Sequence, residues 1–154
     1  MELATLLARD ALLPALKVSS KKQALSEIAN RAADVYGLPA RTVCEGLMDR
    51  ERLGSTAMGH GVAIPHARIK ELDRIAGVFA RLERPVDFEA VDGGGVDLIF
   101  CLLAPEEAGA DHLRTLARVS RMLRDDETRA KLRATADAAA LYALITEPRA
   151  SRAA

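Results

Sequence analysis

The spacing of apolar residues predicts two helices in the first third of the chain. Ser20 and Gln23 have the spacing of a capping box, and apolar residues follow at a helical period to about Gly37. Pro39 suits the first position of a second helix, which should end near Gly54. Only a short apolar segment precedes them, so we expect the chain to begin with helices.

The middle of the chain has the patterns of β-structure. Residues 54–68 break the helical period with three glycines around short β-prone pieces, which predicts a loop or hairpin ending in residues 62–64. Residues 75–82 predict a strand, and the turn-forming glycines at 92–95 lead into the nearly continuous apolar run 96–104. Such a run is typical of a strand buried on both faces.

The last third of the chain returns to helical periods. A long helix is predicted from about Gly109, and shorter helices over 126–134 and 136–146. Helices, then strands, then helices, with no internal repeat, predict an α/β single-domain sandwich with a central mixed β-sheet flanked by helices. We expect this domain to span residues 3–146, with a flexible C-terminal tail over 147–154.

Composition narrows the possible partners. The 154 residues are 49% hydrophobic, enough for one domain with a real core, and 22 basic residues balance 22 acidic ones. With no net charge, no Trp and few other aromatic residues, nucleic-acid binding is disfavoured, and no apolar run is long enough for membrane insertion. Cys44 and Cys101 are far apart and lack CxxC spacing, which favours free thiols in a reducing, cytoplasmic setting.

The segment GSTAMGHGVAIPHAR, residues 54–68, holds two of the three histidines. Pro65 restricts the backbone that enters His66, so this imidazole is held in a fixed direction. His66 could simply end a strand and bond a carbonyl group. Its neighbours also suit an anion, since hydroxyls donate hydrogen bonds and glycines expose backbone N–H groups. These candidate phosphate-binding residues are Ser55, Thr56, Gly59 and Gly61.

Three kinds of chemistry can be compared for these histidines. A zinc site is disfavoured because His60 and His66 have no cysteine nearby and His112 lies 46 residues beyond His66. A serine triad is disfavoured because GSTAM does not match GxSxG. In the third scheme His66 is itself the nucleophile toward a phosphoryl group, and Arg50 and His112 supply positive charge or N–H donors.

Two longer segments resemble a known family. RERLGSTAMGHGVAIPHAR (50–68) and VDLIFCLLAPEEAGADHLRTLARVSRMLRD (96–125) are similar to the IIA domains of the fructose/mannitol class of the bacterial phosphoenolpyruvate-dependent phosphotransferase system, and most similar to its nitrogen-regulatory branch. The resemblance implies that His66 accepts a phosphoryl group from a histidine of an HPr-like carrier protein. It assigns supporting roles to Arg50 and His112, and it implies no cofactor or metal.

The resemblance leaves two functions open. One is a regulator whose phosphorylation state governs binding to targets such as transporters or sensor kinases. The other is a sugar-transport IIA component that passes the phosphoryl group to a IIB protein. The motif sequences LGST and GVAIPH resemble those of the nitrogen-regulatory branch, and these residues contain no IIB-type or IIC-type segment. Both features favour the regulator. Ala57, where a glycine is usual, and Gly95, where a proline is usual, depart from the branch pattern.

The carrier protein is expected to dock over the histidine loop. Because the net charge is zero, the contact should be mainly apolar. Its apolar residues would be Ala57, Met58, Val62 and Ile64. His60 is expected to be an exposed loop residue beside this interface.

Overall fold

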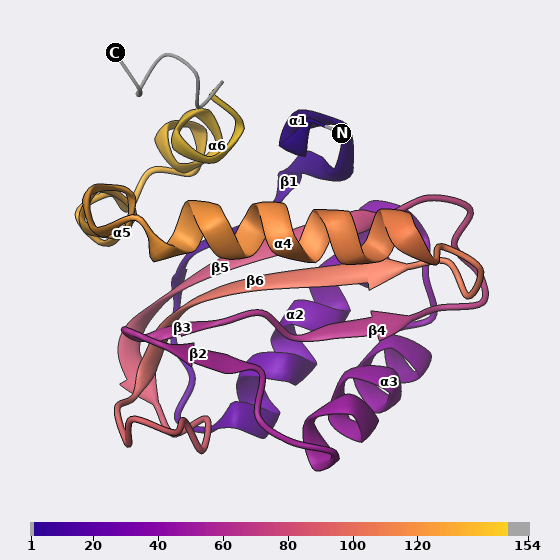
Figure 1. Cartoon of the computed structure of the whole chain (residues 1–154), viewed down its shortest axis with the longest axis horizontal. Helices are drawn as coiled ribbons and strands as arrows, with labels where there is room; N and C mark the ends of the chain where they lie inside the picture. The colour runs from indigo at the N-terminus through magenta and orange to yellow at the C-terminus, as the bar shows by residue number, and fades with distance from the viewer. Residues whose placement is uncertain (1, 148–154) are drawn as a thin grey trace.

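A six-stranded mixed sheet with helices on both faces forms the structure (Figure 1). The computed structural model describes residues 2–147. In chain order its elements are α1 (Leu3–Leu6), β1 (Leu7–Leu16), α2 (Lys21–Tyr36), α3 (Ala40–Arg52), β2 (Ala57–Gly59), β3 (Val62–Ala63), β4 (His66–Arg68), β5 (Ala76–Val86), β6 (Val96–Ala104), α4 (Ala110–Arg124), α5 (Asp126–Arg133) and α6 (Ala138–Thr146). The predicted α/β fold with a mixed sheet is confirmed.

Strand β6 is the centre of the sheet. The strand order is β1-β5-β6-β3-β2, and β4 also pairs with β6. β5 runs antiparallel to β6, whereas β3 and β4 run parallel to it. All of β6 except Asp97 is buried, as its apolar run predicted, because α2 and α3 cover one face of the sheet and α4 covers the other (Figure 1).

The predicted helices are present, with two local differences at their starts. The Ser20 hydroxyl accepts a hydrogen bond from the backbone N–H of Gln23, as expected of an N-cap. The Gln23 side chain, however, accepts from the backbone N–H of Ser19 and not from that of Ser20. Pro39 is the N-cap residue of α3 and not its first helical residue.

The expectation that only a short apolar segment precedes the first two predicted helices was wrong. The short helix α1 and the ten-residue strand β1 precede α2, and β1 pairs in parallel with β5 at the edge of the sheet. Pro14 lies within β1, which an edge strand tolerates because its outer side forms no ladder. Residues 54–68 contain β4 in addition to the predicted hairpin. The flexible tail was predicted over residues 147–154. Of these residues the structure describes only Glu147, so the prediction lies almost entirely outside the described residues.

Candidate functional site

His66 is the first residue of β4, in register with Leu102 of β6. The carbonyl of Pro65 accepts a hydrogen bond from the Leu102 N–H at 2.9 Å, and Ile64 N–H donates to the Thr56 carbonyl at 3.1 Å. The backbone that enters His66 is therefore bonded on both sides to neighbouring strands or loops. The imidazole itself is half-buried and faces solvent on one side.

Two hydrogen bonds define the tautomer of His66. Its Nδ1 lies 2.9 Å from the Ile64 carbonyl oxygen, which can only accept, so Nδ1 carries the hydrogen. Its Nε2 lies 3.3 Å from Nε of Arg50, which can only donate, so Nε2 holds a lone pair. These two contacts fit the tautomer with the hydrogen on Nδ1, which leaves the Nε2 lone pair directed at Arg50. The bond from Nδ1 to the Ile64 carbonyl, which a purely structural histidine would also form, fixes the direction of the ring.

Arg50 reaches His66 from the last turn of α3. Its Nη1 donates to the carbonyl of Gly54 at 2.9 Å, just after the helix, while its Nε faces His66. A guanidinium is planar and rigid, so holding Nη1 also sets the direction of Nε. The structure therefore brings together two of the residues that the sequence singled out.

His112 completes this cluster from the first turn of α4. Its ring centroid lies 5.6 Å from that of His66, and the two rings are inclined by 59°. The residue is only 5% exposed, and its Nδ1 is buried without a hydrogen-bond partner among the described residues. Burial, followed by the nearby His66 and Arg68, lowers the pKa of His112 below its ordinary value, which favours the neutral ring.

The two hydroxyls of the loop form internal hydrogen bonds. Ser55 donates to the Phe88 carbonyl at 2.5 Å and accepts from the N–H of Ala57. Thr56 donates to the carboxylate of Glu51. Both side chains thus close the turn after α3. This is the structural role that was expected as the alternative to phosphate binding.

Gly59 and Gly61 lie at the tip of the β2–β3 hairpin, away from His66. Val62, next to Gly61, is in register with Leu98, whereas His66 is in register with Leu102 of the same strand. Four residues along a strand separate these points by roughly 13 Å. The structure therefore does not bring these glycines to the imidazole. His60, at the same tip, is exposed as expected.

Arg68 is a site residue that the sequence reasoning missed. It lies two residues after His66 on β4, and alternation along a strand places both side chains on the same face. Its Nη1 donates to the carbonyl of Glu106 at 2.7 Å, and its charge contributes to the lowered pKa of His112. The sequence could have indicated this role, because side chains alternate along a strand and Arg68 lies two residues after His66.

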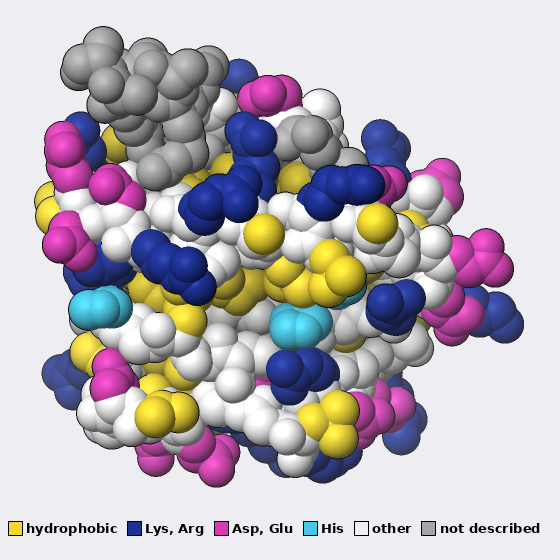
Figure 2. All heavy atoms as spheres, in the orientation of Figure 1, with side chains coloured by type: hydrophobic (Ala, Val, Ile, Leu, Met, Phe, Trp, Pro, Cys, Tyr) yellow, Lys and Arg dark blue, Asp and Glu magenta, His cyan; other side chains and the backbone are white. Residues whose placement is uncertain are grey.

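The apolar surface around the site differs from the expectation. Val62 and Ile64 are buried in the core, so they are not available for docking. Leu53, after α3, and Leu113, beside His112, are 85% and 67% exposed. Figure 2 shows histidine side chains at the centre of this face, with a basic side chain directly beside them and apolar side chains above and below.

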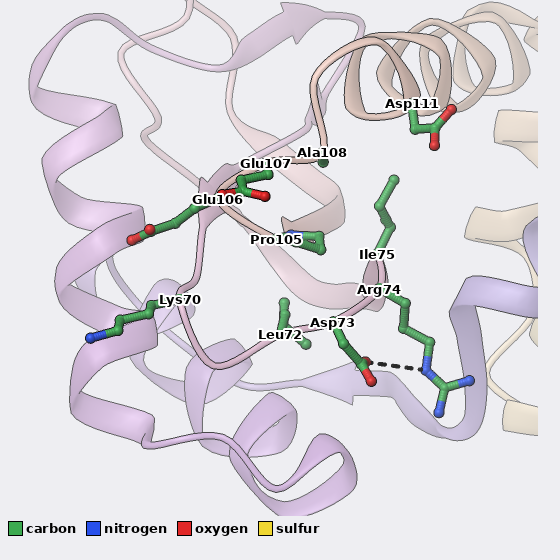
Figure 3. Close-up of a pocket in the computed structure, with 10 residues that line it drawn as sticks. All are labelled: Lys70, Leu72, Asp73, Arg74, Ile75, Pro105, Glu106, Glu107, Ala108 and Asp111. Atoms are coloured by element: carbon green, nitrogen blue, oxygen red, sulfur yellow. Dashed lines mark ion pairs between the residues drawn. The ribbon is translucent and has the colours of Figure 1, made fainter.

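An open cavity of about 600 Å³ lies beyond the end of β4 (Figure 3). Leu72, Ile75 and Pro105 point into it, whereas the charged groups of Lys70 and Glu106 point away. Asp73 and Arg74 form a loose ion pair at its rim. No set of polar groups converges inside, so the histidine cluster is the stronger candidate site.

Residues 2–147 contain neither a cluster of metal ligands nor a membrane-spanning helix. No three His, Cys, Asp or Glu side chains in this range are grouped as a metal ion would require. No helix in the same range is both long enough and apolar enough to cross a membrane.

Comparison with known proteins places the chain in a family. Residues 5–147 match the family model described as "Phosphoenolpyruvate-dependent sugar phosphotransferase system, EIIA 2", and the chain belongs to this family. A nitrogen regulatory protein of Bradyrhizobium diazoefficiens is 56% identical over 153 residues, covering 99% of this chain and all of that protein. Within the family, the chain therefore falls in the nitrogen-regulatory branch.

Solved structures show the same architecture. The nitrogen regulatory protein IIA-Ntr from Neisseria meningitidis is 35% identical, with a TM-score of 0.88 over 94% of this chain and 99% of that one. A complex of the mannitol IIA enzyme with phosphorylated IIB from Escherichia coli contains a similar fold, with a TM-score of 0.76 over 92% of this chain and 96% of that one. At 18% identity, this second likeness shows the fold alone.

Proposed function

We propose that the chain is a phosphorylation-dependent regulator that carries a phosphoryl group on Nε2 of His66. The observation that carries this proposal is the pair of hydrogen bonds that leaves the lone pair on Nε2. The donor is an HPr-like carrier protein with its own phosphohistidine. The Nε2 lone pair attacks phosphorus, the bond from phosphorus to the donor nitrogen breaks, and the donor ring keeps that electron pair.

The neighbouring groups stabilise the charge on the transferred phosphoryl group. Arg50 releases Nε2 as the new bond forms, and its Nε–H then donates to a phosphoryl oxygen. His112 is the second donor: its ring lies beside that of His66, and burial, followed by the nearby His66 and Arg68, lowers its pKa and so favours the neutral ring, which still has one N–H to donate. Arg68 adds a cation at the same face. Ser55 and Thr56 shape the loop, and the proposal assigns no phosphate contact to Gly59 or Gly61.

The carrier docks on the exposed apolar residues that flank the imidazole. Leu53 and Leu113 lie on elements at either side of His66 and are the exposed leucines of this region. Because the chain has no net charge, the affinity should depend only modestly on salt. Both cysteines are free, which is typical of the reducing cytoplasm where we place the reaction.

The proposal is tested by incubating the protein with phosphoenolpyruvate, an enzyme-I-type kinase and an HPr-like carrier. Mass spectrometry should show one acid-labile phosphoryl group on His66, which is absent in His66→Ala. An acid-stable phosphoester on Ser55, or unchanged labelling of His66→Ala, would overturn it. Regulatory targets such as transporters or sensor kinases would then be sought by comparing binding to the two phosphorylation states.

A further inference from the structure

Glu51 is a buried carboxylate one residue beyond Arg50, in the last turn of α3. It is 8% exposed and forms three polar contacts. Nζ of Lys21 lies 2.8 Å from its Oε1, the N–H of Thr56 donates to the same oxygen at 3.1 Å, and the Thr56 hydroxyl donates to Oε2. Both carboxylate oxygens are therefore bound to groups on other segments.

Lys21 offsets the negative charge of the buried Glu51 carboxylate. Its side chain is 14% exposed, its Nζ lies 5.0 Å from the centroid of the Phe88 ring, and Glu89 is a second, weaker partner at 3.6 Å. A buried charge needs both an opposite charge and hydrogen bonds to offset its lost hydration. The arrangement satisfies this need and links the start of α2 to the end of α3.

The same contacts fix the position of the turn at residues 54–56, which holds the side chain of Arg50. Gly54 and Thr56 belong to one short turn, which is tied to Glu51 by the Thr56 side chain and by the bond from Gly54 N–H to the Glu51 carbonyl at 3.1 Å. The carbonyl of Gly54 accepts from Nη1 of Arg50. A displaced turn would therefore move the acceptor that orients the guanidinium toward His66.

We propose that Glu51 is a positioning residue, which acts with Thr56 and Lys21 to hold Arg50 against Nε2 of His66. The inference rests on the proposed function only for its effect on phosphoryl transfer. The alternative is that Thr56 contacts the phosphoryl group directly. The structure disfavours it because the Thr56 hydroxyl hydrogen is already donated to Glu51.

The first experiment observes Arg50 in the unphosphorylated protein and needs no phosphoryl transfer. The Nε–H signal of Arg50 is followed by NMR, together with its rate of exchange with water. Thr56→Val, which removes only the hydroxyl, should speed this exchange by about fivefold, the factor expected for loss of one hydrogen bond. Glu51→Ala should have a larger effect, and Glu51→Gln a smaller one, because the amide can still bond both groups of Thr56.

Asp49→Asn is the matched control. Asp49 lies in the same part of α3 and also flanks Arg50 in sequence, but it is 69% exposed and paired with Arg52. Its substitution removes the same charge as Glu51→Gln and leaves the turn intact. Thermal melting identifies any variant that fails to fold. If the Glu51 variants do not fold, the result rests on Thr56→Val, which leaves the ion pair between Lys21 and Glu51 in place.

The second experiment is a double-mutant cycle in the rate of phosphoryl transfer from the carrier. If Thr56 acts through Arg50, Thr56→Val slows transfer in the wild type but has no further effect in Arg50→Ala. An equal loss in both backgrounds would mean that Thr56 contacts the phosphoryl group itself and would overturn the inference. Unchanged Arg50 exchange in Thr56→Val and Glu51→Ala would overturn it as well, even if His66 proved not to be phosphorylated.

Discussion

The ring of His112 lies 5.6 Å from the ring of His66, with Nδ1 of His112 buried and without a partner among residues 2–147. A proton on His112 would add a charge inside the protein and close to Arg68, which is why burial and this cation lower its pKa. The unphosphorylated site therefore favours a neutral His112. This preference has consequences for stability and for the phosphorylated state.

The lowered pKa of His112 should appear in the pH dependence of stability. Below about pH 6.5 the unfolded chain takes up a proton at His112 that the folded chain resists, so the unfolded state binds more protons. The free energy of unfolding should therefore fall as the pH is lowered through this range. His112→Gln, which cannot titrate, should lose less stability over the same range. Urea unfolding of both proteins between about pH 5 and pH 7.5 measures the difference. Parallel curves would contradict the prediction.

Arg50 should affect the rate of phosphoryl transfer and not the identity of the acceptor. Arg50→Ala removes a donor from a charged transition state, a change that typically costs on the order of 10²-fold in rate. Arg50→Lys should recover little, because an ammonium group lacks the planar fork that reaches both the Gly54 carbonyl and Nε2. Single-turnover transfer from a labelled carrier gives all the rates on one scale.

Arg52→Ala is the control for this series, since Arg52 lies in the same helical turn but is exposed and paired with Asp49. It should transfer at nearly the wild-type rate. A comparable loss in Arg52→Ala would show that general positive charge, and not the contact of Arg50 with His66, supports the reaction.

The helices and the central strands were predictable because their patterns are local. Strand β6 is apolar throughout and could be assigned from its sequence alone. Strand β1 was missed because it contains the charged pair Arg9 and Asp10 as well as Pro14, features that an edge position tolerates. Its place beside β5 is set by long-range pairing, which no local pattern contains.

The site was only partly predictable for the same reason. His66 could be singled out from Pro65 and its neighbours, whereas Arg50 and His112 were only candidate donors until the family resemblance assigned them supporting roles. The structure supplies the contacts, at 3.3 Å to Arg50 and 5.6 Å between the two rings. Glu51 was missed because a glutamate at the end of a helix usually lies in solvent, and only the fold buries it.

Gly61 should matter for stability and not for phosphoryl transfer. Its φ is +78°, and an added Cβ would collide with the Arg133 guanidinium and lie 2.9 Å from Oδ1 of Asp97. Gly61→Ala should cost about 2–4 kcal/mol, from the left-handed backbone and the disrupted ion pair. Gly93→Ala, with a similar φ of +73° and open space around it, should cost less, about 1–2 kcal/mol. Urea unfolding measures both. A large loss in the transfer rate of folded Gly61→Ala would instead support a phosphate contact at the hairpin.

Phosphorylation of His66 should raise the pKa of His112. In the unphosphorylated protein burial and two nearby basic groups lower this pKa. A phosphoryl group on Nε2 would place about two negative charges beside the same ring, and a nearby opposite charge favours the protonated imidazole. The protonated ring has two donors, so it can bond a phosphoryl oxygen and stabilise the carried group.

NMR titration of the three histidines before and after phosphorylation tests this expectation. The signals of His112 should move to a higher midpoint in the phosphorylated protein. The signals of His60, which is exposed at the hairpin tip away from His66, serve as the internal reference for the two samples. An unchanged midpoint for His112 would mean that the phosphoryl group points away from α4, and Arg50 and Arg68 would then be its main partners.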